Sequence, residues 1–451
     1  MDRPTGARPR RDRPTGAPTL RTTAAALLVL LSGCDGASEG PGGPARIVFS
    51  GSAVGREAEL VRSQLGRFMA ENPDVMVEVQ ATPDAADQRH QLYVQWLNAR
   101  VGEPDVLQLD VIWTPEFAAA GWILPLDSLA PERGAFFPAT LAANSWNGRL
   151  YALPWFVDVG MLYWRTDLLD GPPATLEELA RMARARDPET TPYGFVWQGA
   201  RYEGLVTVFL EHLGAFGGEI VDEEGRVAVA RAPAVDALRF MTAAVAEGGW
   251  VPSAVLAWRE EQTRFAFQNG QALFMRNWPY AYSLLADRSA SEVAGRFAVA
   301  PLPVAGAVLT SAPNAAPTAA LGGAQLAVNA RSRHPDAARR VVEYLTRPDQ
   351  MLERARVLGH YPSRPDLYDD PRLAEALPVP AAEARRVIER ARPRPVIPVY
   401  TELSTILQIW LHRALTGQRD PAMALAEAAR EIERLLERVR LAPTAVAGAT
   451  P

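Results

Sequence analysis

The sequence predicts an α/β protein with two domains. Between residues 46 and 111, short apolar runs alternate with amphipathic stretches in the order strand, helix, strand, helix, strand, which is typical of a sheet covered by helices on both faces. A second alternating set follows from about residue 160. About 400 of the 451 residues remain after an N-terminal signal segment is subtracted, which is more than one hydrophobic core usually serves.

The first set places a polar residue where ligands of such sheets bind. Its predicted strands are 46–51 (RIVFSG), 75–80 (VMVEVQ) and 104–111 (PDVLQLDV), and its predicted helices are 57–72 and 91–100. A parallel sheet is expected from this succession. Ligands of parallel sheets bind beyond the carboxyl ends of the strands, so Asp110, at the end of the third strand, is a candidate contact.

The second set continues the alternation to the C-terminus. Its predicted strands are 160–165, 193–197, 272–277 and 297–303, and its predicted helices are 176–186, 205–213, 235–247 and 260–268. Thr175 stands at the N-cap position of the first of these helices. One more strand is predicted at 322–329, followed by long Arg-, Glu- and Ala-rich helices that include 334–346 and 421–440. The last helix is amphipathic and is expected to pack on a domain.

The N-terminus predicts an exported protein anchored by a lipid. A basic stretch, an apolar run at about 22–31 and small residues follow in the order of a secretory signal, and the run is too short for a hydrocarbon core of ~30 Å. Leu31-Ser32-Gly33-Cys34 resembles the bacterial lipobox, which implies that Cys34 becomes the lipidated first residue of the mature chain. The alternative for this single cysteine is a buried thiol. Arg10-Arg11 leaves twin-arginine export open.

The composition argues against several other classes of protein. The formal net charge is −5 and every basic residue is Arg, whereas a nucleic-acid-binding protein would need a basic surplus. Five His and one Cys without metal-ligand spacing predict no zinc or haem site, and no cofactor is expected. No Walker motif is present, so any ATP hydrolysis belongs to partner chains.

Six stretches, taken in order, carry a resemblance to a known family. They are LDVIWTPEFAAAGWILPLD (109–127), LYALPWFVDVGMLYWRTDLL (150–169), WQGARYEGL (197–205), FMRNWPYAY (274–282), LGGAQLAVN (321–329) and RPRPVIPVYTELS (392–404). Together they resemble the extracellular solute-binding proteins of ABC sugar importers, above all the trehalose/maltose-binding branch. The resemblance implies a periplasmic-binding-protein-like fold, in which two discontinuous α/β lobes are joined by a hinge and hold the ligand in the cleft between them.

The resemblance also implies domain boundaries. A signal peptide is expected at 1–33, the lipidated cysteine and a flexible tether at 34–45, lobe 1 at 46–154 and 298–358, lobe 2 at 155–297 and 359–441, and a disordered tail at 442–451. The three crossovers between the lobes are expected near 153–158, 296–301 and 359–365. Glycine and proline cluster near the latter two, where a chain must change direction.

Side chains suited to a sugar stand at the matched positions. Hydroxyls both donate and accept hydrogen bonds, while the C–H face of a sugar is apolar, so carboxylates, arginines and aromatic planes suit it. The resemblance implies contacts from Asp110, Asp158, Glu203, Trp278, Arg394, Glu57, Arg89 and Phe156, and close backbone approach at Gly322 and Gly323. Trp113 and Tyr193 are candidates to extend the aromatic surface.

Most of these residues also have a purely structural interpretation. The alternatives are a helix cap for Asp110, a hinge hydrogen bond for Asp158, a favourable helix N-terminus for Glu203, an ion pair between lobes for Arg394, a tight turn for the two glycines, and core packing for Trp278, Trp113 and Tyr193. Two positions depart from the family pattern, in which an aromatic residue often follows the paired glycines and a tyrosine often stands at position 156. Ala324 and Phe156 therefore predict a different or larger sugar than trehalose or maltose.

The expected function is capture of a sugar, a disaccharide of the trehalose or maltose type, by a membrane-tethered monomer that closes around it and delivers it to an ABC permease. No catalytic residue and no nucleic-acid partner are expected. Three alternatives stay open. A glycoside hydrolase would need two acids about 5 to 9.5 Å apart, and Asp110 and Glu203 are implied to lie on opposite lobes. A sensor signalling to a membrane kinase would share the fold. A non-sugar solute such as a polyamine would favour a site with several carboxylates and few arginines, and Arg394 argues against such a site.

Overall fold

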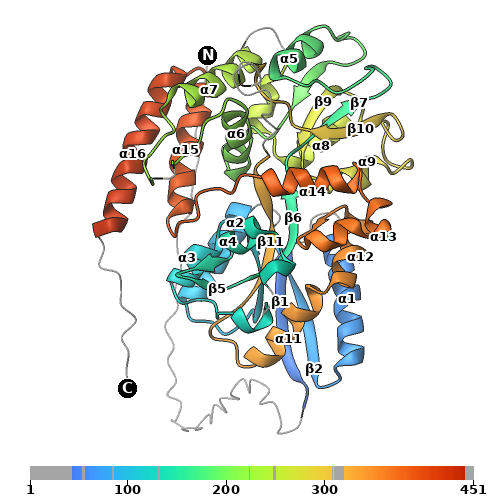
Figure 1. The fold of residues 1–451 in the computed structure, drawn as a ribbon, viewed down its shortest axis with the longest axis vertical. Coiled ribbons are helices and arrows are strands. Elements are labelled where there is room, and N and C mark those ends of the chain that lie inside the picture. The colour runs from blue at the N-terminus through green and yellow to red at the C-terminus, as the bar shows by residue number, and fades with distance from the viewer. Residues whose placement is uncertain are drawn as a thin grey trace, which may run out of the picture. The chain divides into compact units, whose positions relative to one another are not determined.

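The computed structural model describes residues 43–52, 56–83, 86–130, 133–222, 224–246, 250–306, 308 and 319–441. The expected signal peptide, Cys34, most of the tether and the segment 442–451 lie outside these residues. From Pro44 onward, the described residues belong to one compact unit that contains two large sheets (Figure 1).

The first sheet has six strands in the order β12-β6-β11-β3-β1-β2. Its strands are β1 (Ala45–Ser52), β2 (Val75–Thr82), β3 (Val106–Asp110), β6 (Leu153–Val159), β11 (Leu321–Val328) and β12 (Tyr361–Pro362). β1 pairs in parallel with β2 and β3, as the first alternating set predicts. This part of the sheet is therefore parallel, as expected, whereas β11, which enters from later in the sequence, is antiparallel to both β3 and β6.

Helices cover both faces of the first sheet. Along β3, Val106 points into the main core, while Leu107 and Leu109 belong to a second core that contains Tyr93 and Trp113. The main-core face is covered by α1 (Glu57–Glu71) and α11 (Pro335–Leu345), and the other face by α2 (Ala86–Asn98) and α3 (Thr114–Ala119). Successive side chains of a strand face opposite ways, so each helix pair buries alternate residues.

The second sheet has four strands in the order β10-β7-β9-β8. Its strands are β7 (Met161–Arg165), β8 (Tyr193–Val196), β9 (Ala272–Asn277) and β10 (Phe297–Pro301). Its helices are α5 (Leu176–Arg184), α6 (Glu203–Ala215), α7 (Ala232–Ala246), α8 (Glu260–Gln268), α15 (Tyr400–Leu415) and α16 (Pro421–Leu441). Thr175 caps α5 by accepting a 3.1 Å hydrogen bond from the backbone of Glu178, as predicted.

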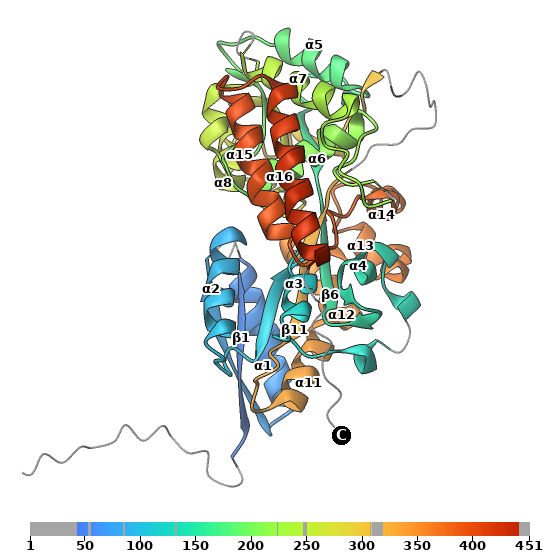
Figure 2. The ribbon, with the colours of Figure 1, turned by 90° about the vertical axis from the view of Figure 1, so that its left-hand side faces the viewer.

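The helix α6 is buried along its whole length. A helix that is buried on all sides needs cover from several neighbours. α7 and α15 provide that cover, and α16 packs on α15 and α7; Figure 2 shows α15 and α16 side by side. The C-terminal helices therefore complete the second half of the molecule, and the amphipathic last helix packs there as expected.

The chain changes sheets at other residues than those expected. The segment near the first expected crossover is β6, a strand of the first sheet, and Gly160 alone separates it from β7 of the second. β10 lies in the second sheet, although lobe 1 was expected to resume at 298, and β12 lies in the first, although lobe 2 was expected to resume at 359. β6 is buried along almost its whole length and shows no alternation of apolar and polar residues, so its sequence does not mark it as a strand that precedes the change of sheet.

Shorter elements complete the described fold. They are α4 (Pro138–Ala143), α9 (Ala281–Leu285), α12 (Pro348–Leu358), α13 (Pro371–Ala374), α14 (Ala381–Arg390), β4 (Ser145–Trp146), β5 (Arg149–Leu150) and four 3₁₀ segments, Asp127–Leu129, Arg133–Ala135, Ser253–Ala257 and Pro365–Asp369. Within the part of the chain that the structure describes, no helix has both the length and the apolar character needed to span a bilayer.

Candidate ligand-binding site

A cavity of about 340 Å³ is lined by residues from both sheets and their helices. This volume lies within the ~300 to 1,000 Å³ typical of small-molecule sites. On the first sheet the cavity follows one edge, because Ser52, Asp110 and Asp158 stand at or near the carboxyl ends of three strands. The strand β11 enters at the same edge, and its register sets Gly322 opposite Asp158 and Ala324 opposite Asp110.

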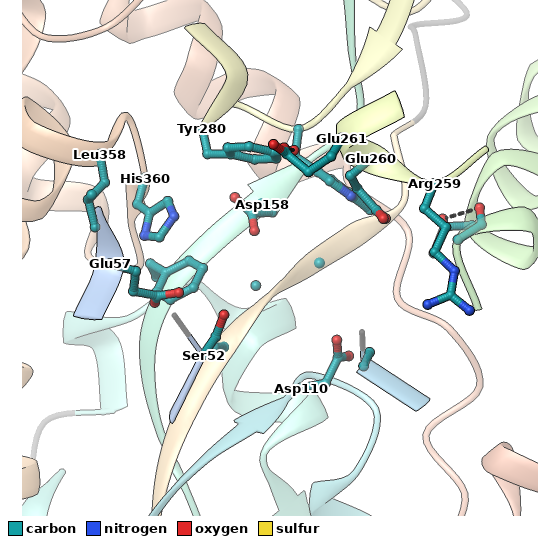
Figure 3. A pocket seen from close by; sticks show the side chains of 18 of the residues that line it. Ser52, Glu57, Asp110, Asp158, Arg259, Glu260, Glu261, Tyr280, Leu358 and His360 are labelled. Atoms are coloured by element: carbon teal, nitrogen blue, oxygen red, sulfur yellow. Dashed lines mark hydrogen bonds between the residues drawn. The ribbon is translucent and has the colours of Figure 1, made fainter. Parts of the chain in front are cut away.

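The second sheet contributes the opposite side of the cavity. Trp278 follows the last residue of β9, and Glu203 is the first residue of α6. In Figure 3, Glu57, His360 and Leu358 lie toward one end of the cavity, and Asp110 and Arg259 lie toward the other. The cavity is therefore lined along its length by groups that are far apart in the sequence.

Arg394 joins two carboxylates from different halves of the fold. Its Nη1 donates to Glu203 Oε1 over 2.7 Å, and its Nη2 lies 3.3 Å from Asp110 Oδ1. The guanidinium is almost fully buried. Burial alone would lower the pKa of Arg394, but the carboxylates of Asp110 and Glu203 raise it above its usual value. This arginine is therefore a fixed cation.

The carboxylate of Glu203 is held by three partners. Besides Arg394, the hydroxyl of Tyr400 donates to its Oε1 over 2.8 Å, and the hydroxyl of Ser404 donates to its Oε2. Both hydroxyls come from α15, which packs on α6. Glu203 is therefore bound by residues of its own half of the molecule and by Arg394, and little of its hydrogen-bonding capacity remains free.

The carboxyl group of Asp158, unlike that of Glu203, has an oxygen without a hydrogen-bond partner in the described part of the chain. Its Oδ1 is fully buried and has no hydrogen-bond partner among the residues that the structure describes. Burial, followed by the charges of Glu57 and Asp110, raises the pKa of Asp158 to about 7. A hinge hydrogen bond, the structural alternative for this residue, is not found for this oxygen. Asp158 is thus an unsatisfied acceptor beside the cavity.

Trp278 lies on a buried ion pair. The guanidinium carbon of Arg276 is 3.9 Å from the centroid of the Trp278 ring, and Arg276 Nε donates to Glu211 Oε2 over 2.7 Å. Gly322 lies close to the same ring. A Cβ at this position would lie 3.2 Å from Trp278 and 3.3 Å from the Asp158 side chain. The ring is therefore held by groups with little freedom to move.

A second buried arginine supports the opposite wall. The guanidinium carbon of Arg354 lies 3.7 Å from the Trp155 ring centroid and 5.0 Å from that of Phe156. Its Nη2 donates to Glu57 Oε1 over 2.7 Å, and Phe156 stacks on His360 with centroids 3.9 Å apart. Each of these arginines thus stands behind an aromatic side chain that lines the cavity.

All predicted contact residues line the cavity except Trp113 and Tyr193. Trp113 is 2% exposed and stacks on Phe117 in the second core, because the turn before α3 directs it toward α2. Tyr193 pairs with Ala272 at the amino end of β9, whereas the cavity lies at the carboxyl end. Neither residue therefore lines the cavity, and both pack in or against a core, which was the structural alternative for them.

Position does not by itself distinguish ligand contact from a structural role. Arg394 makes the ion pair between the two halves that was its structural alternative. Gly322 and Gly323 lie within β11 and not in a turn. Arg89 donates a hydrogen bond to the carbonyl of Pro83 over 3.0 Å. Ligand contact by the lining residues therefore stays a prediction.

Sequence reasoning missed several lining residues. Among them are Tyr202, Arg259, Glu260, Tyr280 and His360. Tyr202 and Tyr280 lie within the matched stretches 197–205 and 274–282, and Arg259 and Glu260 lie at the start of the predicted helix 260–268. Closeness in sequence to these segments could therefore have identified the four residues. His360 follows α12 in a stretch that carries no motif. In the described ranges, no group of His, Cys, Asp and Glu could hold a metal ion.

Two sheets of an α/β fold with a lined cavity between them define a ligand-binding protein of the two-lobed class. The chain belongs to the bacterial extracellular solute-binding protein family, whose model matches residues 54–352. This membership confirms the expected fold and the expected class of protein.

Individual relatives agree with this family. The chain is 36% identical over 373 residues to a probable ABC transporter-binding protein of Deinococcus radiodurans, covering 80% of this chain and 86% of that protein. It is 26% identical over 337 residues to a maltotriose-binding protein of Pyrococcus abyssi, with 73% and 69% covered. Among solved structures, maltose-bound T. maritima MalE3 is 41% identical with a TM-score of 0.81, over 87% of this chain and 100% of that one.

Proposed function

We propose that this protein is the sugar receptor of an ABC importer, which binds a disaccharide of the trehalose or maltose type and delivers it to a permease. The observation that carries the proposal is the cavity, where an unsatisfied acidic group, paired charges and aromatic planes meet. Hydroxyls and the C–H face of a sugar require this combination. The likeness to a maltose-bound structure at 41% identity supports the same class of ligand.

Binding would close the two halves. Asp110, Asp158 and Gly322 belong to the first sheet, whereas Trp278 and Glu203 belong to the second sheet and its helices. A ligand that touches both halves stabilises the closed arrangement by its difference in affinity for the two states. Crossovers between the sheets would then act as the hinge.

We further propose that the protein has no catalytic activity of its own. In a glycoside hydrolase two acids flank the scissile bond, about 5 to 9.5 Å apart. Here Asp110 and Glu203, the acids nominated for that role, both bind the Arg394 guanidinium, at 3.3 and 2.7 Å. That both acids pair with one cation supports a binding role for them in place of a catalytic one.

A thermal-shift screen tests the proposal. Purified mature protein is heated with glucose, maltose, trehalose, maltotriose and, as a non-sugar arm, putrescine. The expected result is stabilisation by a di- or trisaccharide and none by putrescine, because a ligand that binds only the folded state raises its stability. Stabilisation by putrescine alone, or a lack of stabilisation by all of the sugars, would overturn the proposed function. Chromatography of the sugar afterwards checks for hydrolysis, and any cleavage would refute the non-catalytic assignment.

The lipid anchor is a separate part of the proposal. Cys34 is the only cysteine of the sequence, so a Cys34→Ser variant removes the one acceptor for a thioether-linked lipid. The wild-type chain is expected to label with radioactive palmitate in cells and to sediment with membranes. The serine variant is expected to do neither. Equal membrane retention of both chains would exclude Cys34 as the anchor.

A further inference from the structure

His360 lies in the wall of the cavity without an assigned role. It follows α12 and Gly359, whose φ of 75° turns the chain back toward the first sheet. Its ring stacks on Phe156 with centroids 3.9 Å apart and an interplanar angle of 18°. The residue is 7% exposed, and it borders the cavity. Figure 3 shows it at the same end as Glu57 and Leu358.

The neighbour of His360 fixes which ring nitrogen carries the proton. Arg354 Nη2 lies 3.2 Å from His360 Nδ1, and both groups are buried. A guanidinium has five donors and no acceptor, so Nδ1 must accept this hydrogen bond. A neutral imidazole that accepts at Nδ1 carries its hydrogen on Nε2. The arginine therefore selects the Nε2–H tautomer.

Two causes keep this ring neutral. Burial, and then the positive charge of Arg354, lowers the pKa of His360 well below its ordinary value. The side chain therefore presents a neutral donor at all physiological pH values, with no positive charge. In the part of the chain that the structure describes, no residue accepts a hydrogen bond from Nε2.

We propose that His360 is a specificity-determining residue, which donates its Nε2–H to an oxygen of the bound ligand at the Glu57 end of the cavity. The inference rests on the proposed function, because it names the sugar hydroxyl or ring oxygen as the acceptor. His360 adds a neutral ring donor beside Phe156, which offers no polar atom, and beside Glu57 and Asp158, which supply acceptors; the other donors that line the cavity near Glu57 include Arg89 and Gln108. A hydroxyl that donates to a carboxylate still needs a donor for its own oxygen.

Two variants that differ by one methylene separate this role from a structural one. The amide of His360→Asn can replace Nδ1 as the acceptor for Arg354 but does not reach the position of Nε2. The longer amide of His360→Gln can place a donor near Nε2. Both variants lose the stack on Phe156 equally. His360→Gln gives up the acceptor for Arg354 that His360→Asn keeps, so weaker binding by the asparagine variant than by the glutamine variant reports the Nε2 donor.

The readout is the dissociation constant for maltose, trehalose and maltotriose by calorimetry. H360N is expected to weaken binding of the best sugar about tenfold, and H360Q by no more than about threefold, since a lost hydrogen bond that leaves a buried partner unmet costs this much. Equal losses in both variants, or no loss in either, would overturn the role of His360 while the sugar assignment stands. Failure of the wild type to bind any of the three sugars would overturn the proposed function itself.

A spectroscopic measurement on the wild type decides the matter even if a variant does not fold. In ¹⁵N-labelled protein, the imidazole nitrogens report the tautomer directly, and the chain has five histidines to assign. The expected result is an Nε2–H ring for His360 in the free protein, with its proton signal moving downfield when the sugar binds. A ring protonated on Nδ1, or a signal unchanged by sugar, would contradict the proposal.

Discussion

Nη2 of Arg394 lies 3.3 Å from Oδ1 of Asp110, so a cation from the segment before α15 holds the carboxylate that ends β3. The same guanidinium binds Glu203. The two halves of the fold are therefore joined across the cavity by charge as well as by the covalent chain.

Arg394→Gln is expected to destabilise the folded protein by about 3–5 kcal/mol, because removing one partner of a buried pair leaves uncompensated charge. The measurement is urea unfolding without ligand. Arg394→Lys keeps the charge but not the forked geometry, so it should recover part of the loss. A cost below about 1 kcal/mol for the glutamine variant would show that the two carboxylates do not depend on this cation.

Trp278→Ala is expected to weaken sugar binding at least about tenfold, since the ring supplies the largest apolar plane on its side of the cavity. Trp113→Phe is the matched control. Trp113 is a core residue, and its change should lower the stability but leave the dissociation constant unaltered. Calorimetry with maltose measures the binding and thermal unfolding measures the stability. Equal effects of the two variants on binding would refute the assignment of Trp278 as the stacking surface.

Asp158 predicts a pH-dependent stability. Its pKa is about 7 when folded against an ordinary value of 3.8, so the folded state retains a proton that the unfolded chain releases. The stabilising contribution is therefore full below about pH 4 and is lost as the pH rises to about 7, by up to about 4 kcal/mol. Unfolding free energies from pH 4 to 8 should show this slope in the wild type and a smaller one in Asp158→Asn. Identical slopes would contradict the assignment.

The same carboxyl predicts proton release on binding. If a sugar hydroxyl donates to the Asp158 carboxylate, the pKa of Asp158 falls in the complex, and affinity rises from pH 5 to pH 8. Calorimetry at pH 7 in two buffers of different ionisation enthalpy counts the protons released. Release is expected for the wild type and not for Asp158→Asn. Proton uptake in place of release would show that the acid donates to the ligand.

Substitution by alanine is predicted to have different effects at two adjacent glycines. Gly323 has a φ of 113°, and a Cβ there would lie 2.2 Å from the carbonyl oxygen of Phe156. Gly323→Ala should therefore lower the stability by at least about 2 kcal/mol. At Gly322 the nearest atoms, at 3.2 and 3.3 Å, are side chains that line the cavity, so Gly322→Ala should weaken sugar binding more than stability. Urea unfolding and calorimetry compare them, and the reverse order would refute the prediction.

Local pattern predicted most elements of the fold. α8 and β9 begin and end at the predicted residues, because turn residues or caps bound their periodic runs. The sequence did not mark β6 as a strand, since a strand buried on both faces has no alternation. The first change of sheet, at Gly160, lies two residues past the expected segment for the same reason.

The site was predicted where strand ends and motifs coincide, as at Asp110 and Trp278. Trp113 was misplaced because a motif gives the position of a tryptophan in the chain but not the side to which it points. His360 was missed because its role depends on Arg354 and Phe156, and only the folded chain brings these two residues to it.

The shortest link between the two sheets is built on the support of the Trp278 wall. A Cβ at Gly160 would lie 2.0 Å from Glu211 Oε1 and 2.8 Å from Arg276 Nη2, the pair that stands behind the tryptophan. One buried ion pair therefore packs against both the link between the sheets and the wall of the cavity, and neither can be altered alone. A change of ligand that required a new side chain on this wall would therefore also disturb the link between the sheets.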